Sequence, residues 1–248
     1  MVWIYLSPHL DDAALCLGGL IWEQSQAGED VRIWTLCAGD PPPGEFSPFA
    51  QAVHARWGTG REAVMARRAE DMEACAVLGA SCHHFEVPDC IYRRSPRTGV
   101  HLYADENALW SPVHPDEGDL VDAIGVMLQD RLSALPAETK LVSPLTLGDH
   151  VDHRLTRTAA ERVGVPLYFY ADYPYVLGID LWDKVSNHKS IVSSISPEGM
   201  GAWQKAIACH RSQISTFWGG RSEMQIAIQT YYDQIGGIWL GDSSGLQG

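Results

Sequence analysis

Short apolar runs alternate with longer stretches of helical periodicity along this chain of 248 residues. β-rich runs predict strands, and apolar positions that recur every three or four residues predict helices. The predicted strands cover residues 2–6, 31–36, 83–87, 141–145, 167–175 (ending in a turn) and 190–196, and the predicted helices cover 12–26, 61–78 and 120–135, with two more beginning near 150 and 197. With a hydrophobic content of 46%, this alternation predicts a single α/β domain over residues 1–248.

Two irregular stretches interrupt the alternation. Residues 40–60 open with three consecutive prolines, and we expect a loop there with at most one helical turn. Residues 89–118 are rich in proline, arginine and aromatic residues. Because long ordered loops at strand ends commonly carry function, we expect 89–118 to be a substrate-specificity loop.

His9, Asp11 and Asp12 lie where the first predicted strand gives way to a helix. In open α/β sheets, ligands bind at the carboxyl ends of the strands. His9 and Asp12 are three residues apart and can face the same way at a helix start, whereas Asp11 must point elsewhere. The motif can supply two metal ligands and a separate base, although the two carboxylates would also suit a helix N-terminus as caps.

A second junction between strand and helix carries His150, Asp152 and His153 after the apolar run 141–145. The two histidines are again three residues apart, and Asp152 can accept a hydrogen bond from an imidazole N–H. Alone, such a pair is more typical of a solvated helix face than of a metal site. Two such clusters, each following a β-rich run, indicate one shared site.

Both clusters resemble the motifs of the LmbE-like, or PIG-L, family of zinc-dependent deacetylases, which includes N-acetylglucosaminyl-phosphatidylinositol de-N-acetylase. The matching segments are residues 8–12, 36–40, 67–70 followed by Leu78 and Gly79, 150–153, and a late helix with Lys205, Ala208, His210, Ser212 and Gln213. The resemblance implies a Rossmann-like three-layer fold with a mostly parallel central sheet. Leu10 and Ala13 replace a proline and a glutamate that many members carry, and neither position is a ligand.

The resemblance also implies roles for individual residues. His9, Asp12 and His153 look like zinc ligands, one ion per chain, and iron or manganese would also suit such ligands. Asp11 looks like the general base. His150 resembles the histidine that steadies the oxyanion and protonates the leaving amine, with Asp152 orienting it.

Two further residues resemble substrate contacts of the family. Arg67 matches an arginine that contacts substrate, and Asp172 lies in a segment similar to a family motif and could reach substrate hydroxyls. A strand followed by an aromatic turn would explain the Asp172 segment equally well. The implied reaction is hydrolysis of an N-acyl amide, most simply the N-acetyl group of a glucosamine unit.

Two other histidine clusters invite a metal interpretation. Adjacent strand residues face opposite sides, so His83 and His84 are not expected to share one ion. The segment 114–117 reads His-Pro-Asp-Glu but precedes a helix without a buried strand before it. We therefore predict that its acids serve the first turn of that helix.

The charge and composition of the chain limit the classes of molecule that it is expected to bind. The net charge of −13 disfavours nucleic acid and anionic membrane surfaces. No basic leader or long apolar run is evident, and the six cysteines lack metal-knuckle or redox spacing. We expect a cytoplasmic protein that acts on a small N-acetyl amino-sugar without membrane insertion, and a homo-oligomer is compatible with the sequence.

Two alternatives remain open at this level. A metal-dependent phosphoesterase also uses clustered aspartate and histidine, but it needs more bridging carboxylates for two metals. A non-catalytic carbohydrate-binding module on the same fold would have no use for the spare base Asp11 and the spare imidazole His150.

Overall fold

A mostly parallel sheet forms the centre of the molecule, which the computed structural model describes for residues 1–58, 60, 62–186, 188–235 and 237–242. Its order within these residues is β3-β2-β1-β4-β5-β7-β6. The strands are β1 Val2–Ser7, β2 Asp30–Thr35, β3 Ser81–His84, β4 Lys140–Pro144, β5 Leu167–Tyr170, β6 Lys189–Ser193 and β7 Ile238–Asp242. The first five pair in parallel, whereas β7 is antiparallel to both β5 and β6. The predicted fold class is confirmed, with β6 at the expected edge.

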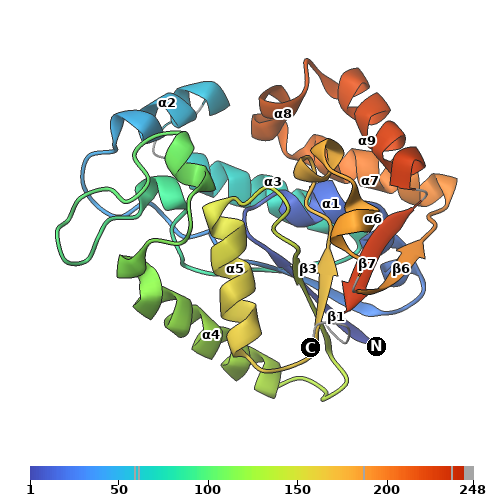
Figure 1. Cartoon of the computed structure of the whole chain (residues 1–248). Helices are drawn as coiled ribbons and strands as arrows, with labels where there is room; N and C mark the ends of the chain where they lie inside the picture. The colour runs from blue at the N-terminus through green and yellow to red at the C-terminus, as the bar shows by residue number, and fades with distance from the viewer. Residues whose placement is uncertain (59, 61, 187, 236, 243–248) are drawn as a thin grey trace.

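Helices cover both faces of the sheet (Figure 1). Within the described residues they are α1 Asp12–Gln26, α2 Pro48–Trp57, α3 Ala63–Leu78, α4 Gly118–Ser133, α5 Val151–Arg162, α6 Leu181–Lys184, α7 Pro197–Cys209, α8 Arg211–Phe217 and α9 Arg221–Ile235, with short 3-10 turns η1 Cys90–Tyr92, η2 Asn107–Trp110, η3 Pro115–Glu117 and η4 Tyr175–Gly178. Helices α1, α3 and α7 pack together on one face, and α4 packs with α5 on the other. None of these helices is long and apolar enough to cross a bilayer.

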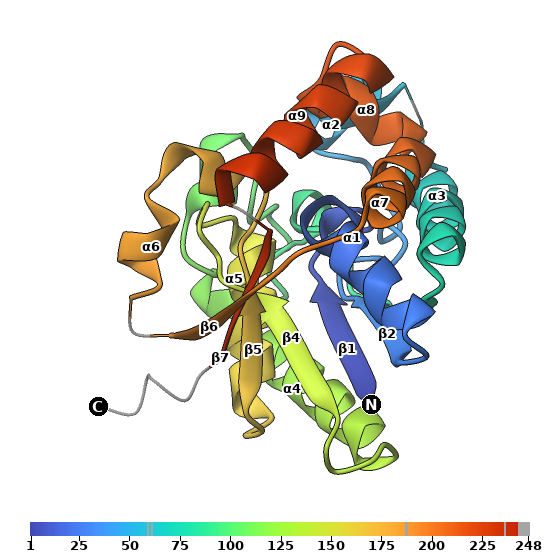
Figure 2. The same ribbon diagram turned by 90° about the vertical axis from the view of Figure 1, so that its right-hand side faces the viewer.

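The strand order reverses between β1 and β4, which are neighbours in the sheet. From β1 the chain builds outward to β2 and β3, and it then returns to add β4 and β5 on the other side. Figure 2 shows the arrowheads of β1 and β4 pointing toward the end of the molecule where α2 and α8 lie. A crevice at such a reversal is the usual ligand site of an open α/β sheet.

Helix α7 packs closely on α1 because two adjacent glycines replace side chains there. A Cβ atom added to Gly18 would lie 2.5 Å from Cδ1 of Trp203, and Gly19 is similarly confined by Ile195. The fully buried Trp203 indole donates a hydrogen bond to the Ala14 carbonyl at 2.8 Å. This contact fixes the helix whose N-terminus carries Asp11 and Asp12.

The structure differs from the sequence prediction in several segments, among them helix α9 and strand β7, which the sequence pattern did not predict. Helix α2 spans ten residues where we expected a loop with one helical turn, because Ser47 caps its N-terminus and Gly58 ends it in a left-handed conformation. Strand β3 spans 81–84 rather than 83–87, since its partner β2 ends at Thr35. Helix α3 begins at Ala63, and the predicted start at residue 61 lies outside the described residues.

Candidate active site

The turn after β1 is held by hydrogen bonds from Ser7 and Asp12. The Ser7 hydroxyl accepts the Ala13 N–H at 3.0 Å and donates to the His9 carbonyl at 2.5 Å. The Asp12 carboxylate accepts the backbone N–H of His9 at 2.8 Å. These bonds fix His9 and Asp12 relative to each other at the carboxyl end of β1.

The turn before α5 presents His150 as a neutral hydrogen-bond donor. Asp149 adopts a left-handed conformation with φ of 60°, which aspartate tolerates better than most residues. His150 follows as the N-cap, and its Nδ1 accepts the Asp152 N–H at 3.2 Å. The hydrogen-bond network therefore assigns the ring proton to Nε2. Burial, reinforced by the neighbouring His9, lowers the pKa of His150 to about 3, so the ring is neutral near pH 7.

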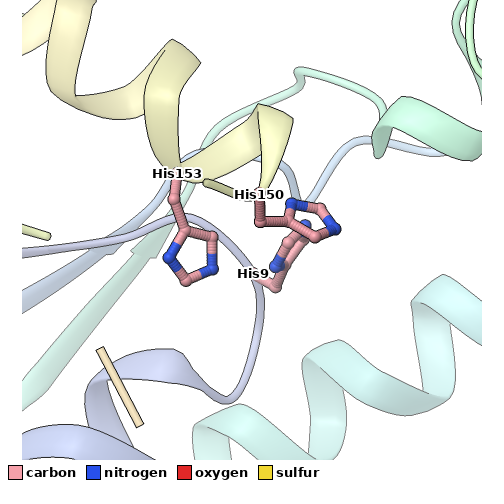
Figure 3. Close-up of side chains that lie close together, drawn as sticks. All are labelled: His9, His150 and His153. Atoms are coloured by element: carbon pink, nitrogen blue, oxygen red, sulfur yellow. The ribbon is translucent and has the colours of Figure 1, made fainter. Parts of the chain in front are cut away.

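Three histidine rings from the two motifs converge on one space (Figure 3). His150 and His153 project from the first turn of α5, and His9 projects from the loop after β1. The ring centroid of His9 lies 4.9 Å from that of His150 and 5.6 Å from that of His153. The shared site expected from the sequence is thus assembled.

Asp12 lies between two of these rings. Its Oδ2 is 3.2 Å from Nδ1 of His9, and its Oδ1 is 3.4 Å from Nε2 of His153. Burial alone would raise the pKa of Asp12, but the His153 and His9 imidazoles hold it well below its usual range. The ionised Asp12 carboxylate therefore faces Nδ1 of His9 and Nε2 of His153.

In His9 and His153, the ring nitrogen that points away from Asp12 is bonded to a fully buried carboxylate. Nε2 of His9 lies 2.9 Å from Oδ2 of Asp152, and Nδ1 of His153 lies 2.6 Å from Oδ1 of Asp172. Both aspartates have 0% exposure. Their placement differs from expectation: Asp152 contacts the ring of His9 rather than that of His150, and Asp172 lies behind His153 with no exposed surface.

This arrangement fits a metal such as zinc. Two imidazoles and one carboxylate are a common ligand set for catalytic zinc, and carboxylates on the far ring nitrogens fix the orientation of such histidines. Ligand atoms of His9, His150 and His153 lie within 4.8 Å of one another, as do those of His9, Asp89 and Asp152. The second set is less suitable because Asp152 is already bonded to other groups, among them the Cys90 N–H.

Asp11 lies beside Arg67. Its Oδ1 is 3.2 Å from Nη2 of Arg67, and both side chains are buried. Burial raises the pKa of Asp11; the Arg67 charge opposes this effect, and the Asp12 charge adds to it. The guanidinium of Arg67 also stacks on the Trp57 ring at 4.6 Å from its centroid. Asp11 therefore combines the features of a general base: it is buried, close to the candidate ligands and raised in pKa.

A cavity of about 260 Å³ opens over these groups. Asp11, Asp12 and His150 line it together with Arg67. Its remaining wall is largely apolar and comes from α2, the 89–118 segment and the C-terminal helices, through Phe49, Val53, Trp57, Leu109, Trp110 and Phe217. A larger cavity of about 530 Å³ lies at the amino ends of β4 and β5, away from the histidines.

Several residues at the site had no role assigned from the sequence. Asp89 lines the cavity, with Oδ2 3.9 Å from Nε2 of His9. Gln213 also lines the cavity, and the preceding Ser212 binds Glu70 through its N–H and hydroxyl at 3.0 and 2.7 Å, which joins α8 to α3. The position of Asp89 just after the 83–87 run was an available signal. The Glu70 contact joins distant segments and had no local signal.

His84 and His114 lie outside this site, but the acids of 114–117 do not cap α4 as predicted, because the Asp116 and Glu117 carboxylates bind Arg97 and Arg93 instead. Nε2 of His84 is 2.7 Å from Oδ2 of Asp71. His114 caps η3 by accepting the Asp116 N–H at 3.1 Å. Neither side chain lines the cavity over the three converging rings.

The sequence of the chain is similar to one protein family and to a characterised relative. The profile of the PIG-L family, described as GlcNAc-PI de-N-acetylase, matches residues 4–163. The chain is 26% identical over 248 residues to 2'-N-acetylparomamine deacetylase of Niallia circulans, which covers 90% of this chain and 85% of that protein.

Solved structures are similar over almost the whole chain. The zinc-inhibited form of teicoplanin deacetylase Orf2 has a TM-score of 0.82 and 26% identity, covering 98% of this chain and 97% of that one. The A40926 pseudoaglycone deacetylase Dbv21 has a TM-score of 0.73 and 27% identity, covering 97% of this chain and 95% of that one.

Proposed function

Because this chain belongs to the PIG-L family and is a deacetylase, we propose that it hydrolyses the N-acetyl amide of a glucosamine-containing substrate with one bound zinc ion. The relatives support this reaction rather than the phosphoesterase or the carbohydrate-binding module considered from sequence. The observation that carries the proposal is the placement of Asp12 between nitrogens of His9 and His153, with Asp11 and His150 beside the same cavity.

His9, Asp12 and His153 would hold the ion, which when bound polarises the amide carbonyl and lowers the pKa of a water molecule toward about 7. Asp11 accepts the proton of the attacking water. Its raised pKa, caused first by burial, brings it closer to the value that suits a base near neutral pH. Arg67, beside Asp11, holds the base in place and keeps its carboxylate from becoming too readily protonated.

His150 stabilises the developing oxyanion. Its Nδ1 is engaged by the Asp152 N–H, so the neutral ring directs its Nε2–H donor toward the cavity. Preorganised donors of this kind are worth about 10²- to 10³-fold in turnover. Because burial keeps the His150 ring neutral, Asp11 takes over the protonating role that the resemblance gave to His150. The proton accepted by Asp11 is returned to the leaving nitrogen, so that the products are acetate and a free amine.

The segment 89–118 is proposed as the substrate-specificity loop. It contributes Asp89, Ile91, Glu106, Leu109 and Trp110 to the cavity wall. Aromatic rings pack against the apolar C–H faces of sugars, and the Trp110 ring lies 5.4 Å from that of His150, close to the proposed chemistry. The amino-sugar would therefore lie between this loop and the apolar face of α2.

Amine release tests the proposal. Zinc-loaded wild-type protein, Asp11→Asn and the control Asp40→Asn are compared on free, glycosidic and lipid-linked N-acetylglucosamine and on 2'-N-acetylparomamine. Asp40 is an exposed residue paired with Arg68, so the control makes the same isosteric change outside the cavity. We expect release by wild type and by Asp40→Asn, and a loss of about 10²- to 10⁴-fold in Asp11→Asn with zinc still bound.

The outcomes separate the parts of the proposal. Near-normal turnover by zinc-loaded Asp11→Asn would exclude Asp11 as the base. Equal turnover by zinc-free and zinc-loaded wild type would exclude a role for zinc in the reaction. If zinc-loaded wild type released no amine from any compound of the panel, the proposed substrate class would be overturned.

A further inference from the structure

Behind the candidate ligands, Arg93 bridges two buried carboxylates. Nη1 of Arg93 lies 2.5 Å from Oδ1 of Asp152, and its Nε lies 2.5 Å from Oε1 of Glu117. Nη1 also donates to the Pro88 carbonyl at 3.2 Å. All three charged side chains are at least nine-tenths buried. A buried ion network of this kind is costly to desolvate, so it calls for a reason beyond stability.

The second carboxylate is itself fixed by a tyrosine. The Tyr103 hydroxyl donates to Oε2 of Glu117 at 2.5 Å and accepts the His114 N–H at 2.9 Å. The Arg93 guanidinium also lies over the Tyr103 ring, 5.3 Å from its centroid. Glu117 therefore has one oxygen on Arg93 and the other on Tyr103, so Arg93 is held in a defined position.

Through Asp152, this network reaches a candidate metal ligand. Oδ1 of Asp152 binds Arg93, while Oδ2 accepts the Cys90 N–H at 3.0 Å and lies 2.9 Å from Nε2 of His9. Both oxygens of Asp152 are therefore committed, one to Arg93 and the other to the Cys90 N–H and the His9 ring.

We propose that Arg93 is a positioning residue, which orients His9 for metal binding by fixing Asp152 between its own guanidinium and the His9 ring. With Nε2 donating to Asp152, His9 presents Nδ1 to the space shared with Asp12, 3.2 Å away. Glu117, the last residue of the His-Pro-Asp-Glu segment, thus supports the metal site from a distance. The inference rests on the proposed role of His9 as a ligand.

The test measures zinc affinity by competition with a chromophoric chelator, together with thermal unfolding of the metal-free protein. Arg93→Met removes the charge at similar length, Arg93→Lys keeps the charge without the planar fork, and Glu117→Gln loosens the support of Arg93. The control Arg97→Met removes an arginine of the same segment, one that is 75% exposed in its side chain and binds Asp116 instead.

Loss of an outer partner typically lowers metal affinity by about 10- to 100-fold, and we expect this loss in Arg93→Met. Arg93→Lys and Glu117→Gln should fall between Arg93→Met and wild type, and Arg97→Met should match wild type. A merely structural role would instead lower the unfolding temperature of Arg93→Met and leave its zinc affinity within about twofold of wild type, which would overturn the proposal.

Two further outcomes are also decisive. If Arg93→Met does not fold, Tyr103→Phe provides the same test, because it removes one hydrogen bond to Glu117 and leaves every charge in place. A measurable loss of zinc affinity in Tyr103→Phe supports the proposal, and an unchanged affinity overturns it. Failure of wild type itself to bind zinc would overturn both the proposed function and this inference, whereas equal binding by wild type and Arg93→Met would overturn the inference alone.

Discussion

Nδ1 of His153 lies 2.6 Å from Oδ1 of Asp172, a residue with no exposed surface. Oδ2 of Asp172 accepts the Leu147 N–H at 3.2 Å, so both carboxylate oxygens are engaged. The bond fixes the ring of His153 with Nε2 toward Asp12. The residue expected to touch substrate is instead a partner of a candidate ligand.

Asp172→Asn is therefore expected to weaken zinc binding. The amide oxygen can still accept the His153 N–H, but the negative charge that makes the imidazole a stronger ligand is lost. Zinc affinity should fall by about tenfold or more, and the KM of the zinc-saturated enzyme should stay close to that of wild type. Titration with a competing chelator gives the affinity. If the KM rose and the affinity did not change, Asp172 would be a substrate contact after all.

His150→Asn is expected to reduce kcat with little effect on zinc affinity. Asparagine can cap α5 in place of the imidazole, but it cannot direct an Nε2–H donor into the cavity. Loss of one oxyanion donor costs about 10²- to 10³-fold in turnover.

His114→Asn is the matched control for this prediction. His114 caps η3 through the same Nδ1 contact but does not line the cavity. Steady-state kinetics of both variants decide the question, and comparable losses in the two would show that capping, rather than oxyanion stabilisation, is the source of the effect.

Gly18→Ala is expected to destabilise the fold. The added Cβ would lie 2.5 Å from Cδ1 of Trp203, whose indole is fully buried and hydrogen-bonded, so it cannot yield easily. Overpacking of this kind lowers the free energy of unfolding by about 1–3 kcal/mol. Gly201→Ala, at an exposed position of α7 with no atom within 4 Å of the added Cβ, should be neutral or raise stability by up to about 1 kcal/mol. Urea denaturation distinguishes the two variants, and a neutral Gly18→Ala would contradict the packing argument.

Cys82 is expected to react with iodoacetamide near neutral pH. A hydrogen bond from Cys75 lowers the pKa of the partly exposed Cys82 thiol to about 7, against the opposing effect of burial. The thiolate is the nucleophile, so the alkylation rate should rise as pH increases through about 7 and level off above about 8. Burial raises the pKa of Cys209, so that thiol should reach its plateau only at higher pH.

Peptide mapping after timed alkylation measures both cysteines in one sample. In Cys75→Ala, the half-maximal rate at Cys82 should move toward about pH 8.5, the ordinary value for a free thiol. Reaction of Cys209 ahead of Cys82 at pH 7 would contradict this prediction.

The sequence predicted the groups that stand at strand ends, because their signals are local. Each of the three candidate ligands, His9, Asp12 and His153, follows an apolar run and lies at the start of a helix. Their placement at the same edge of the sheet therefore follows from the topology of a parallel sheet. The central strands were predictable for the same reason. Helix α2 was missed because the three prolines before it favoured a loop, although its Ser47 cap lies only three residues before its buried Ala50.

Pairings between distant segments could not be predicted in the same way. The bond from Asp172 to His153 and the bridge from Arg93 to Glu117 depend on side-chain directions that are set only when helices pack on the sheet. Asp152 illustrates the limit. The family resemblance implied that it orients His150, yet its carboxylate turns to His9 because Arg93 and the Cys90 N–H lie on that side.

The separation of the two motifs along the chain also affects how the protein forms. His9 and Asp152 are 143 residues apart, so the site has a high contact order and cannot exist until β4 has docked beside β1. An emerging polypeptide that ends before α5 offers only His9 and Asp12 from this ligand set. Metal capture would then be a late event in biogenesis, and retention of the ion would report that both halves of the sheet have come together.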